Sequence, residues 1–138
     1  MALSLVPAGA EPEPPRSAAI SEAEGQAAFR AVRTLFERWG VTDAQGAVLL
    51  DAPLRTYRRW KADAPPRMGR DLKARLGNLL GIHKALRILF TDPARGYAWV
   101  RAPNAAFAGA SALEVMLGGE LTDLMRVRRY LDAERGGW

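Results

Sequence analysis

Apolar residues recur every three or four positions over most of the chain after Ser21, the spacing of helices with one buried face. The first stripe begins at Ser21-Glu-Ala-Glu24, a helix-capping box, and ends before Gly40. Longer stripes cover about residues 69–90 and about residues 120–133. Capping residues and prolines predict shorter helices at about residues 43–50, 54–62, 93–101 and 112–117. No segment alternates apolar and polar residues between turns, so an all-α fold is predicted.

The same stripes indicate which side chains form the core. The helix at residues 43–50 is predicted to bury Val48 and Leu49. In the two long helices the inward side chains are Leu72, Leu76, Leu79, Leu80, Leu86, Leu89 and Phe90, then Leu121, Leu124, Met125 and Leu131. Gly77 and Gly81 interrupt the longer stripe, and a glycine inside a helix costs about 1 kcal/mol relative to alanine. They predict either a bend or a close approach by another helix.

Composition narrows the chemistry that this fold can support. The 138 residues include no cysteine and one histidine, which excludes disulfides, zinc–thiolate sites, a cysteine nucleophile and multi-histidine metal sites. No nucleophile–base pair and no glycine-rich phosphate loop after a strand is recognisable. We therefore expect no enzyme, no catalytic residue, no metal and no cofactor. Neither a membrane span of ~20 apolar residues nor a basic start to a secretion signal is present, so a cytoplasmic location is expected.

The net charge of +5 is concentrated in the middle of the chain. Residues 41–90 carry ten Lys and Arg against four Asp, a net charge of +6. By contrast, residues 1–40 sum to −1 and residues 91–138 to zero. This asymmetry favours a basic surface for a polyanion, most often nucleic acid, and the alternative is a basic face that is only solvated.

Residues 43–62 have the pattern of a helix-turn-helix, with a turn at Asp51-Ala-Pro53 between two short helices. Tyr57 and Trp60 in the second helix are spaced to pack on the first, so its polar side chains point elsewhere. Arg reads guanine in the major groove, and Lys or Thr reaches phosphates or bases. The residues predicted to bind DNA are therefore Arg55, Thr56, Arg58, Arg59 and Lys61.

Further basic residues follow directly and are expected to line the DNA backbone: Arg67, Arg70, Lys73 and Arg75. Two features depart from the usual motif, because the turn lacks the common glycine and Gly46 stands where alanine is usual. Gly46 is expected only to reduce bulk where the two helices cross. The alternative is a solvated basic helix in a bundle.

The C-terminal half carries an ordered set of short motifs: Trp99, Pro103-Asn104, Gly109-Ala-Ser-Ala-Leu-Glu114, Tyr130-Leu131 and a short tail that ends at Trp138. In order and spacing it resembles the toxin-binding domain of Xre/MbcA/ParS-type antitoxins. The helix-turn-helix is similar to the Xre-like domain that precedes it in that family, and the resemblance covers about residues 28–138. One departure is Ala112, where the family usually has proline after the serine.

Residues 1–20 are rich in proline and lack apolar periodicity, so a flexible Pro-rich tail without a counterpart in the family is expected there. The resemblance implies that residues 21–66 form the helix-turn-helix DNA-binding module and residues 67–138 a small helical domain for toxin binding and dimerisation. The chain is then a type II antitoxin and a homodimer, whose partners are operator DNA and a RES-domain toxin that consumes NAD. It blocks the NAD site of that toxin and, together with it, represses its own promoter.

Toxin-binding residues are expected in the last forty positions or so, by the same resemblance: Trp99, Arg101, Asn104, Asp132, Arg135 and Trp138. Trp99 is also typical of a core residue, and Asn104 of a turn cap. Gly136 and Gly137 would let the tail bend into a concave site, where Arg135 pairs with an acidic residue and Trp138 fills the flat slot for a ring of NAD. The alternative function is a stand-alone Xre-like transcriptional regulator without a toxin partner.

Overall fold

The structure is a computed structural model that describes residues 21–63, 65 and 67–136. The expectations for the tail at residues 1–20, for Gly137 and for Trp138 lie outside the described residues. In the described part, the chain forms seven α-helices and no strand, so the all-α prediction is confirmed. The helices are α1 (Glu22–Trp39), α2 (Asp43–Leu49), α3 (Leu54–Ala62), α4 (Arg70–Leu89), α5 (Pro93–Trp99), α6 (Ala112–Met116) and α7 (Leu121–Glu134), with a short 3₁₀ helix, η2 (Ala105–Phe107).

Capping residues set the starts of α1, α2 and α6 as the sequence predicts. The hydroxyls of Ser21, Thr42 and Ser111 each accept a hydrogen bond from the backbone N–H three residues on, at 3.1, 3.1 and 3.0 Å. In return, the side chain at that third position accepts from the capping residue's own N–H. These reciprocal bonds satisfy backbone donors that a helix start otherwise leaves unpaired.

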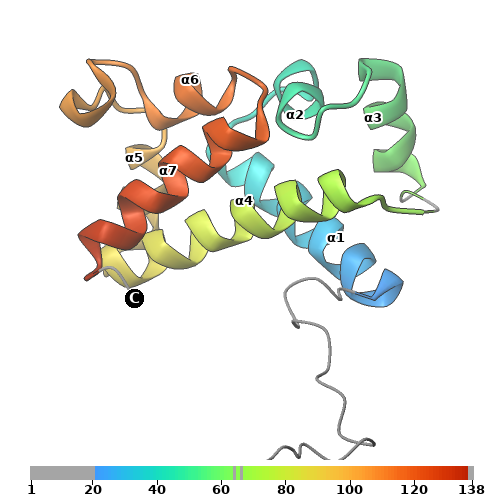
Figure 1. The fold of residues 1–138 in the computed structure, drawn as a ribbon, viewed down its shortest axis with the longest axis horizontal. Helices are drawn as coiled ribbons and strands as arrows, with labels where there is room; N and C mark the ends of the chain where they lie inside the picture. Colours follow the sequence, from blue (N-terminus) through green and yellow to red (C-terminus); the bar gives the residue numbers. More distant parts are fainter. Residues whose placement is uncertain (1–20, 64, 66, 137–138) are drawn as a thin grey trace, which may run out of the picture.

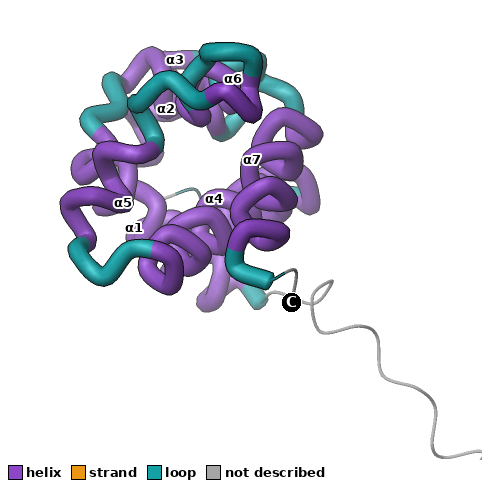
Figure 2. Tube along the Cα trace, turned by 90° about the vertical axis from the view of Figure 1, so that its left-hand side faces the viewer, coloured by secondary structure: helices purple, strands orange, loops and turns teal. Residues whose placement is uncertain are grey.

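Helix α4 is the axis of the fold, and α1 and α7 pack on different sides of it (Figure 1). Helices α2 and α3 form one end of the molecule, and α5, η2 and α6 lie towards the other (Figure 1). Viewed along the long direction, the helices are arranged in a ring (Figure 2). The buried apolar side chains of these helices form one hydrophobic core. One core therefore serves both halves of the chain, since its buried members come from every α-helix except α5.

The largest fully buried side chains are Phe29, Val32, Trp39, Leu49, Leu76, Leu79, Ile82, Val100, Met116, Leu124, Val127 and Leu131. Most predicted core residues are confirmed, although Leu80, Leu89, Phe90, Leu121 and Met125 are only half-buried. Val48 is a wrong prediction, because 41% of it is exposed. The short helix α2 turns Gly46, Ala47 and Leu49 inward instead.

Of the two glycines in α4, only Gly81 lies at a close approach. A methyl group at Gly81 would come within 2.5 Å of the Arg128 guanidinium from α7, whereas nothing lies within 4 Å of such a group at Gly77. Helix α4 is continuous from Arg70 to Leu89, so neither glycine ends it. The Arg128 side chain lies over this stretch of α4, and its Nη1 donates weakly to the Gly77 carbonyl at 3.5 Å.

Candidate functional site

The outer side of α3 carries the residues predicted to bind DNA. Arg55, Arg58 and Arg59 are exposed, and Thr56 and Lys61 are half-buried. For Arg55 and Arg59 the described part of the chain offers no hydrogen-bond or ion-pair partner. These guanidinium groups are therefore available to an anionic ligand.

The inner side of α3 is anchored by two aromatic residues on two different helices. Tyr57 is 3% exposed and lies against Gly46 of α2, where a methyl group would come within 2.8 Å of the phenol ring. The small residue thus permits the crossing of α2 and α3, as predicted. Trp60 instead packs edge-on against Phe29 of α1, with ring centroids 6.2 Å apart. The prediction that both aromatics rest on α2 is wrong for Trp60, because its ring meets Phe29 of α1.

Asp43, the first residue of α2, holds two of the α3 cations. Its carboxylate accepts from Lys61 Nζ at 2.6 Å and lies 3.5 Å from Arg58 Nε. The hydrogen bond from Lys61 lowers the pKa of Asp43 below its ordinary value, so this carboxylate is charged at neutral pH. Burial, together with this nearby negative charge, raises the pKa of Tyr57. Asp43 was not among the predicted site residues, although its position in the first turn of α2 beside a basic helix was a usable signal.

The turn between α2 and α3 contains Asp51 with a positive φ of 53°, a left-handed conformation that glycine most often supplies. Aspartate tolerates this conformation better than most residues do. Its carboxylate lies 4.0 Å from Arg75 Nη2 on α4. The turn therefore has the shape expected of a helix-turn-helix without the usual glycine.

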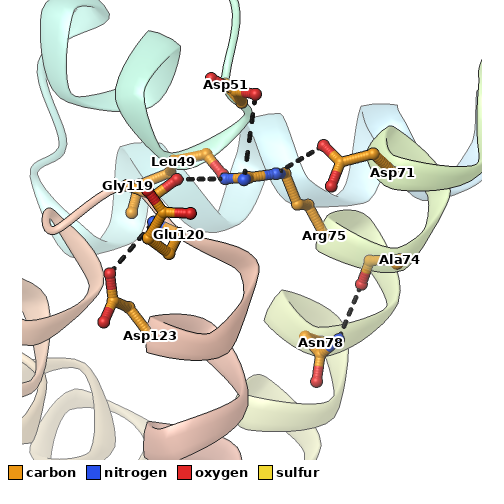
Figure 3. A network of polar contacts seen from close by, with 9 residues as sticks. All are labelled: Leu49, Asp51, Asp71, Ala74, Arg75, Asn78, Gly119, Glu120 and Asp123. Carbon is orange, nitrogen blue, oxygen red and sulfur yellow. Dashed lines mark hydrogen bonds and ion pairs between the residues drawn. The ribbon is translucent and has the colours of Figure 1, made fainter.

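Arg75 is the centre of a buried polar network and not a contact for the DNA backbone, which corrects that prediction (Figure 3). It is 4% exposed, and its Nε donates to Asp71 at 2.7 Å. Its Nη1 donates to the carbonyl of Leu49 at 3.2 Å and to that of Gly119 at 2.9 Å. Arg75 thus joins the end of α2 to the turn between α6 and α7. The other predicted backbone contacts stay at the surface, with Arg67 and Arg70 exposed and Lys73 half-buried near Glu22 at 3.5 Å.

Three aromatic rings gather on the surface formed by α5, η2 and α7. Trp99 stacks on Tyr130 with ring centroids 6.2 Å apart and planes 8° apart, and both rings contact Phe107 edge-on. Phe107 is buried, while Trp99 and Tyr130 are half-buried. The Arg126 guanidinium lies over the Phe107 ring, 5.3 Å from its centre. We call these four residues the aromatic surface; the sequence analysis named only Trp99 for it, although Tyr130 was among the motif residues.

Two other predicted toxin-binding residues have structural partners. Arg101 Nη1 donates to the carbonyls of Trp39 and Gly40 at 3.0 and 3.2 Å, which satisfies the end of α1. The Asn104 side chain accepts from the N–H of Ala106 at 2.8 Å and so caps η2, the turn-capping role weighed for it from the sequence. The exposed part of Arg101 leaves it within reach of a partner as well.

The last turn of α7 carries a small ion-pair group. Asp132 lies 3.8 Å from Arg128 Nε and 3.5 Å from Arg135 Nη1. Gly136 follows with φ of 105°, so the chain leaves the helix in a conformation that favours glycine. Trp138 lies outside the described residues.

The end of α7 and the outer side of α3 lie at opposite ends of the molecule, and both views agree on this (Figures 1 and 2). The two surfaces can therefore be occupied at the same time. In the described part, no group of three or more His, Cys, Asp or Glu is placed to hold a metal ion. None of the described helices is long and apolar enough to cross a membrane.

Comparison with known proteins assigns both halves of the chain. Residues 18–81 match the family model of the antitoxin Xre-like helix-turn-helix domain, and residues 85–137 match that of the antitoxin Xre/MbcA/ParS C-terminal toxin-binding domain. The chain is also 44% identical over 125 residues to uncharacterized protein y4oB of Sinorhizobium fredii. That alignment covers 90% of this chain and 93% of the relative.

Proposed function

This chain belongs to the family of Xre/MbcA/ParS antitoxins, and on that premise we propose that it neutralises a RES-domain toxin by blocking its NAD site. At the coarser level it is a type II antitoxin with a helix-turn-helix for DNA binding and a toxin-binding domain. The observation that carries the proposal is the match of the toxin-binding domain to residues 85–137, which include the aromatic surface and the last turn of α7.

The DNA-binding role rests on α3. We infer that a homodimer presents one α3 from each subunit to a two-fold operator in the promoter of its own operon. Arg55 and Arg59 support this role because they are exposed and have no partner in the described part of the chain. Buried Tyr57 fixes the opposite side of the same helix. A helix held on one face and cationic on the other fits the major groove.

The toxin-binding role divides between a docking surface and a plug. The aromatic surface supplies half-buried rings beside Arg126, a combination that is enriched where protein interfaces concentrate their binding energy. The plug is residues 135–138, which begin directly after α7 and include Gly136 with its positive φ. Arg135 would exchange its ion pair with Asp132 for an acidic residue of the NAD site. Inhibition then needs no chemistry, because occupancy alone excludes NAD.

The test is deletion of residues 135–138 from the otherwise complete chain, followed by two measurements with the toxin encoded beside it. We expect the truncated protein still to bind the toxin in size-exclusion chromatography, because the aromatic surface is intact. We expect NAD consumption by the complex to return to the rate of the free toxin. The matched control is Arg129→Ala, an exposed substitution on α7 outside both the aromatic surface and the tail.

Three outcomes separate the possibilities. A truncated complex that stays inert towards NAD would place inhibition in the helical surface and refute the plug. If the intact chain binds the toxin but does not reduce its consumption of NAD, the RES assignment is refuted. Failure of the intact chain to bind any toxin encoded beside it would favour the stand-alone regulator.

A further inference from the structure

The four basic side chains of α3 fall into two classes. Arg55 and Arg59 have no partner in the described part of the chain, whereas Lys61 and Arg58 share one carboxylate, that of Asp43 on α2. The Lys61 contact is a close hydrogen-bonded ion pair at 2.6 Å, and the Arg58 contact is longer at 3.5 Å. One acidic residue therefore neutralises part of the surface that is proposed to face DNA.

We propose that Asp43 occupies the place of a DNA phosphate, and so weakens binding of α3 to DNA of arbitrary sequence. The inference rests on the proposed DNA-binding role of α3 and adds a residue that limits it. Lys61 must leave Asp43 before it can contact a phosphate, whereas Arg58, whose side chain is 62% exposed, meets one with part of its charge already offset by Asp43. The carboxylate then stays at the surface, where its side chain is 34% exposed, and repels the same phosphates.

The surrounding contacts prevent α3 from relieving this competition by a shift of its end. The Lys61 carbonyl accepts a hydrogen bond from Arg33 Nη1 of α1 at 2.8 Å. Trp60 packs on Phe29 of the same helix. The last turn of α3 is thus fixed to α1 while its Lys61 side chain is fixed to α2. A phosphate has to displace the carboxylate and cannot draw the whole turn away from it.

Such a carboxylate affects non-specific binding more than sequence-specific binding. Non-specific affinity comes almost wholly from phosphate contacts and released counterions, so the loss of two cations removes a large part of it. Specific binding adds base contacts, which Arg55 can make without leaving any partner. Asp43 therefore raises the ratio of specific to non-specific affinity, the quantity that decides where a repressor is found in a genome.

The experiment compares Asp43→Asn with Asp63→Asn in the full chain. Both substitutions remove one negative charge, but Asp63 caps the end of α3 and forms no ion pair with a cation of the described residues. The probe is a fluorescent random-sequence duplex, and affinity is measured by anisotropy over a series of salt concentrations. Melting curves followed by circular dichroism establish that each variant is folded.

We expect Asp43→Asn to bind the random duplex about three- to tenfold more tightly near physiological salt, from two surface ion pairs and one removed repulsion. The slope of log K against log salt should steepen by about 1–2, because each new phosphate contact adds about 0.9. Asp63→Asn should change the affinity by less than about twofold.

An Asp43→Asn protein that binds the random duplex no more tightly than wild type overturns the inference. An equal gain for Asp63→Asn also overturns it, because net charge then explains the effect. If Asp43→Asn is poorly folded, Asp43→Ser, which also removes the carboxylate, is measured in its place, and an affinity no higher than wild type counts against the inference. Arg55→Ala distinguishes the two proposals: if it leaves DNA binding unchanged, the role of α3 itself fails and this inference fails with it.

Discussion

Helices α3 and α7 both carry several arginines and use them in opposite ways. On α3, Arg55 and Arg59 extend into solvent without a partner in the described part of the chain. On α7, Arg128 lies across α4 beside Gly81 and pairs with Asp132. Arg126, on the same helix, covers the Phe107 ring. The guanidinium groups of Arg55 and Arg59 thus have no partner among the described residues, whereas two of those on α7 are packing groups.

The difference follows from the acidic residues that each helix carries. No Asp or Glu occurs within Leu54–Ala62, and the acidic partner of α3 comes from α2. Helix α7 contains Asp123, Asp132 and Glu134 and has no excess of positive charge. An arginine with an acidic neighbour one turn away is held along its own helix. The number of acidic residues near the arginines, more than the number of arginines, therefore distinguishes a helix surface suited to nucleic acid from one whose arginines pack against the protein.

Replacement of Arg75 by methionine tests how much a buried arginine that holds other parts of the chain contributes to stability. The substitution leaves the carbonyls of Leu49 and Gly119 without their donor, and unsatisfied buried groups cost about 1–3 kcal/mol each. We expect the free energy of unfolding to fall by about 2–4 kcal/mol, measured by urea denaturation.

Arg59→Met is the matched control, because it removes the same side chain from an exposed position. Its free energy of unfolding should stay within about 0.5 kcal/mol of wild type. Equal stability of the two variants would mean that the Arg75 network contributes nothing and that the contrast between free and packed arginines is wrong.

Arg55→Ala tests the other side of the comparison. We expect binding to DNA from its own promoter to weaken by about 1–3 kcal/mol, the range for one base-reading arginine. Arg129→Ala on α7 removes the same charge from another exposed position and should leave this affinity within about 0.5 kcal/mol. Electrophoretic mobility shift at fixed salt measures both, and similar losses for the two would show that only the total charge matters.

The smallest expected change in the free energy of unfolding concerns two glycines at helix crossings, Gly46 between α2 and α3 and Gly81 between α4 and α7. Alanine is the better helix former by about 1 kcal/mol at either site, so the difference between two substitutions isolates the steric cost. Gly46→Ala meets the buried Tyr57 ring and should destabilise by about 1–2 kcal/mol. Gly81→Ala meets only the mobile end of Arg128 and should stay within about 0.5 kcal/mol, as thermal unfolding will measure. Equal losses would show that Arg128 is held as firmly as Tyr57.

Much of the fold was predictable because its signals are local. The capping boxes at Ser21, Thr42 and Ser111 each lie within four residues of sequence, and all three form. The exposed arginines of α3 were predictable for the same reason, since one short helix fixes which side chains share a face. The family resemblance followed from motif order in the C-terminal half and is confirmed by the domain matches.

What the sequence analysis missed depends on contacts between distant residues. Arg75 occupies the buried stripe of α4, three residues after Leu72 and four before Leu79, yet its charge suggested the surface. Its acceptors at Leu49 and Gly119 are backbone carbonyls, which no side-chain pattern reveals. Trp60 likewise packs on Phe29 of α1, a contact between residues distant in sequence that the pattern within α3 does not show.

The position of α4 has a consequence for how such proteins diversify. This helix packs against α1 and against α7, and its Arg75 side chain holds carbonyls from both halves. The two family matches meet between residues 81 and 85, inside α4, so a chimera cut at that boundary divides a shared helix. The exchanged parts must also agree at Arg75 and around Gly119. New pairings of operator and partner therefore arise more readily by surface substitution than by recombination of whole modules.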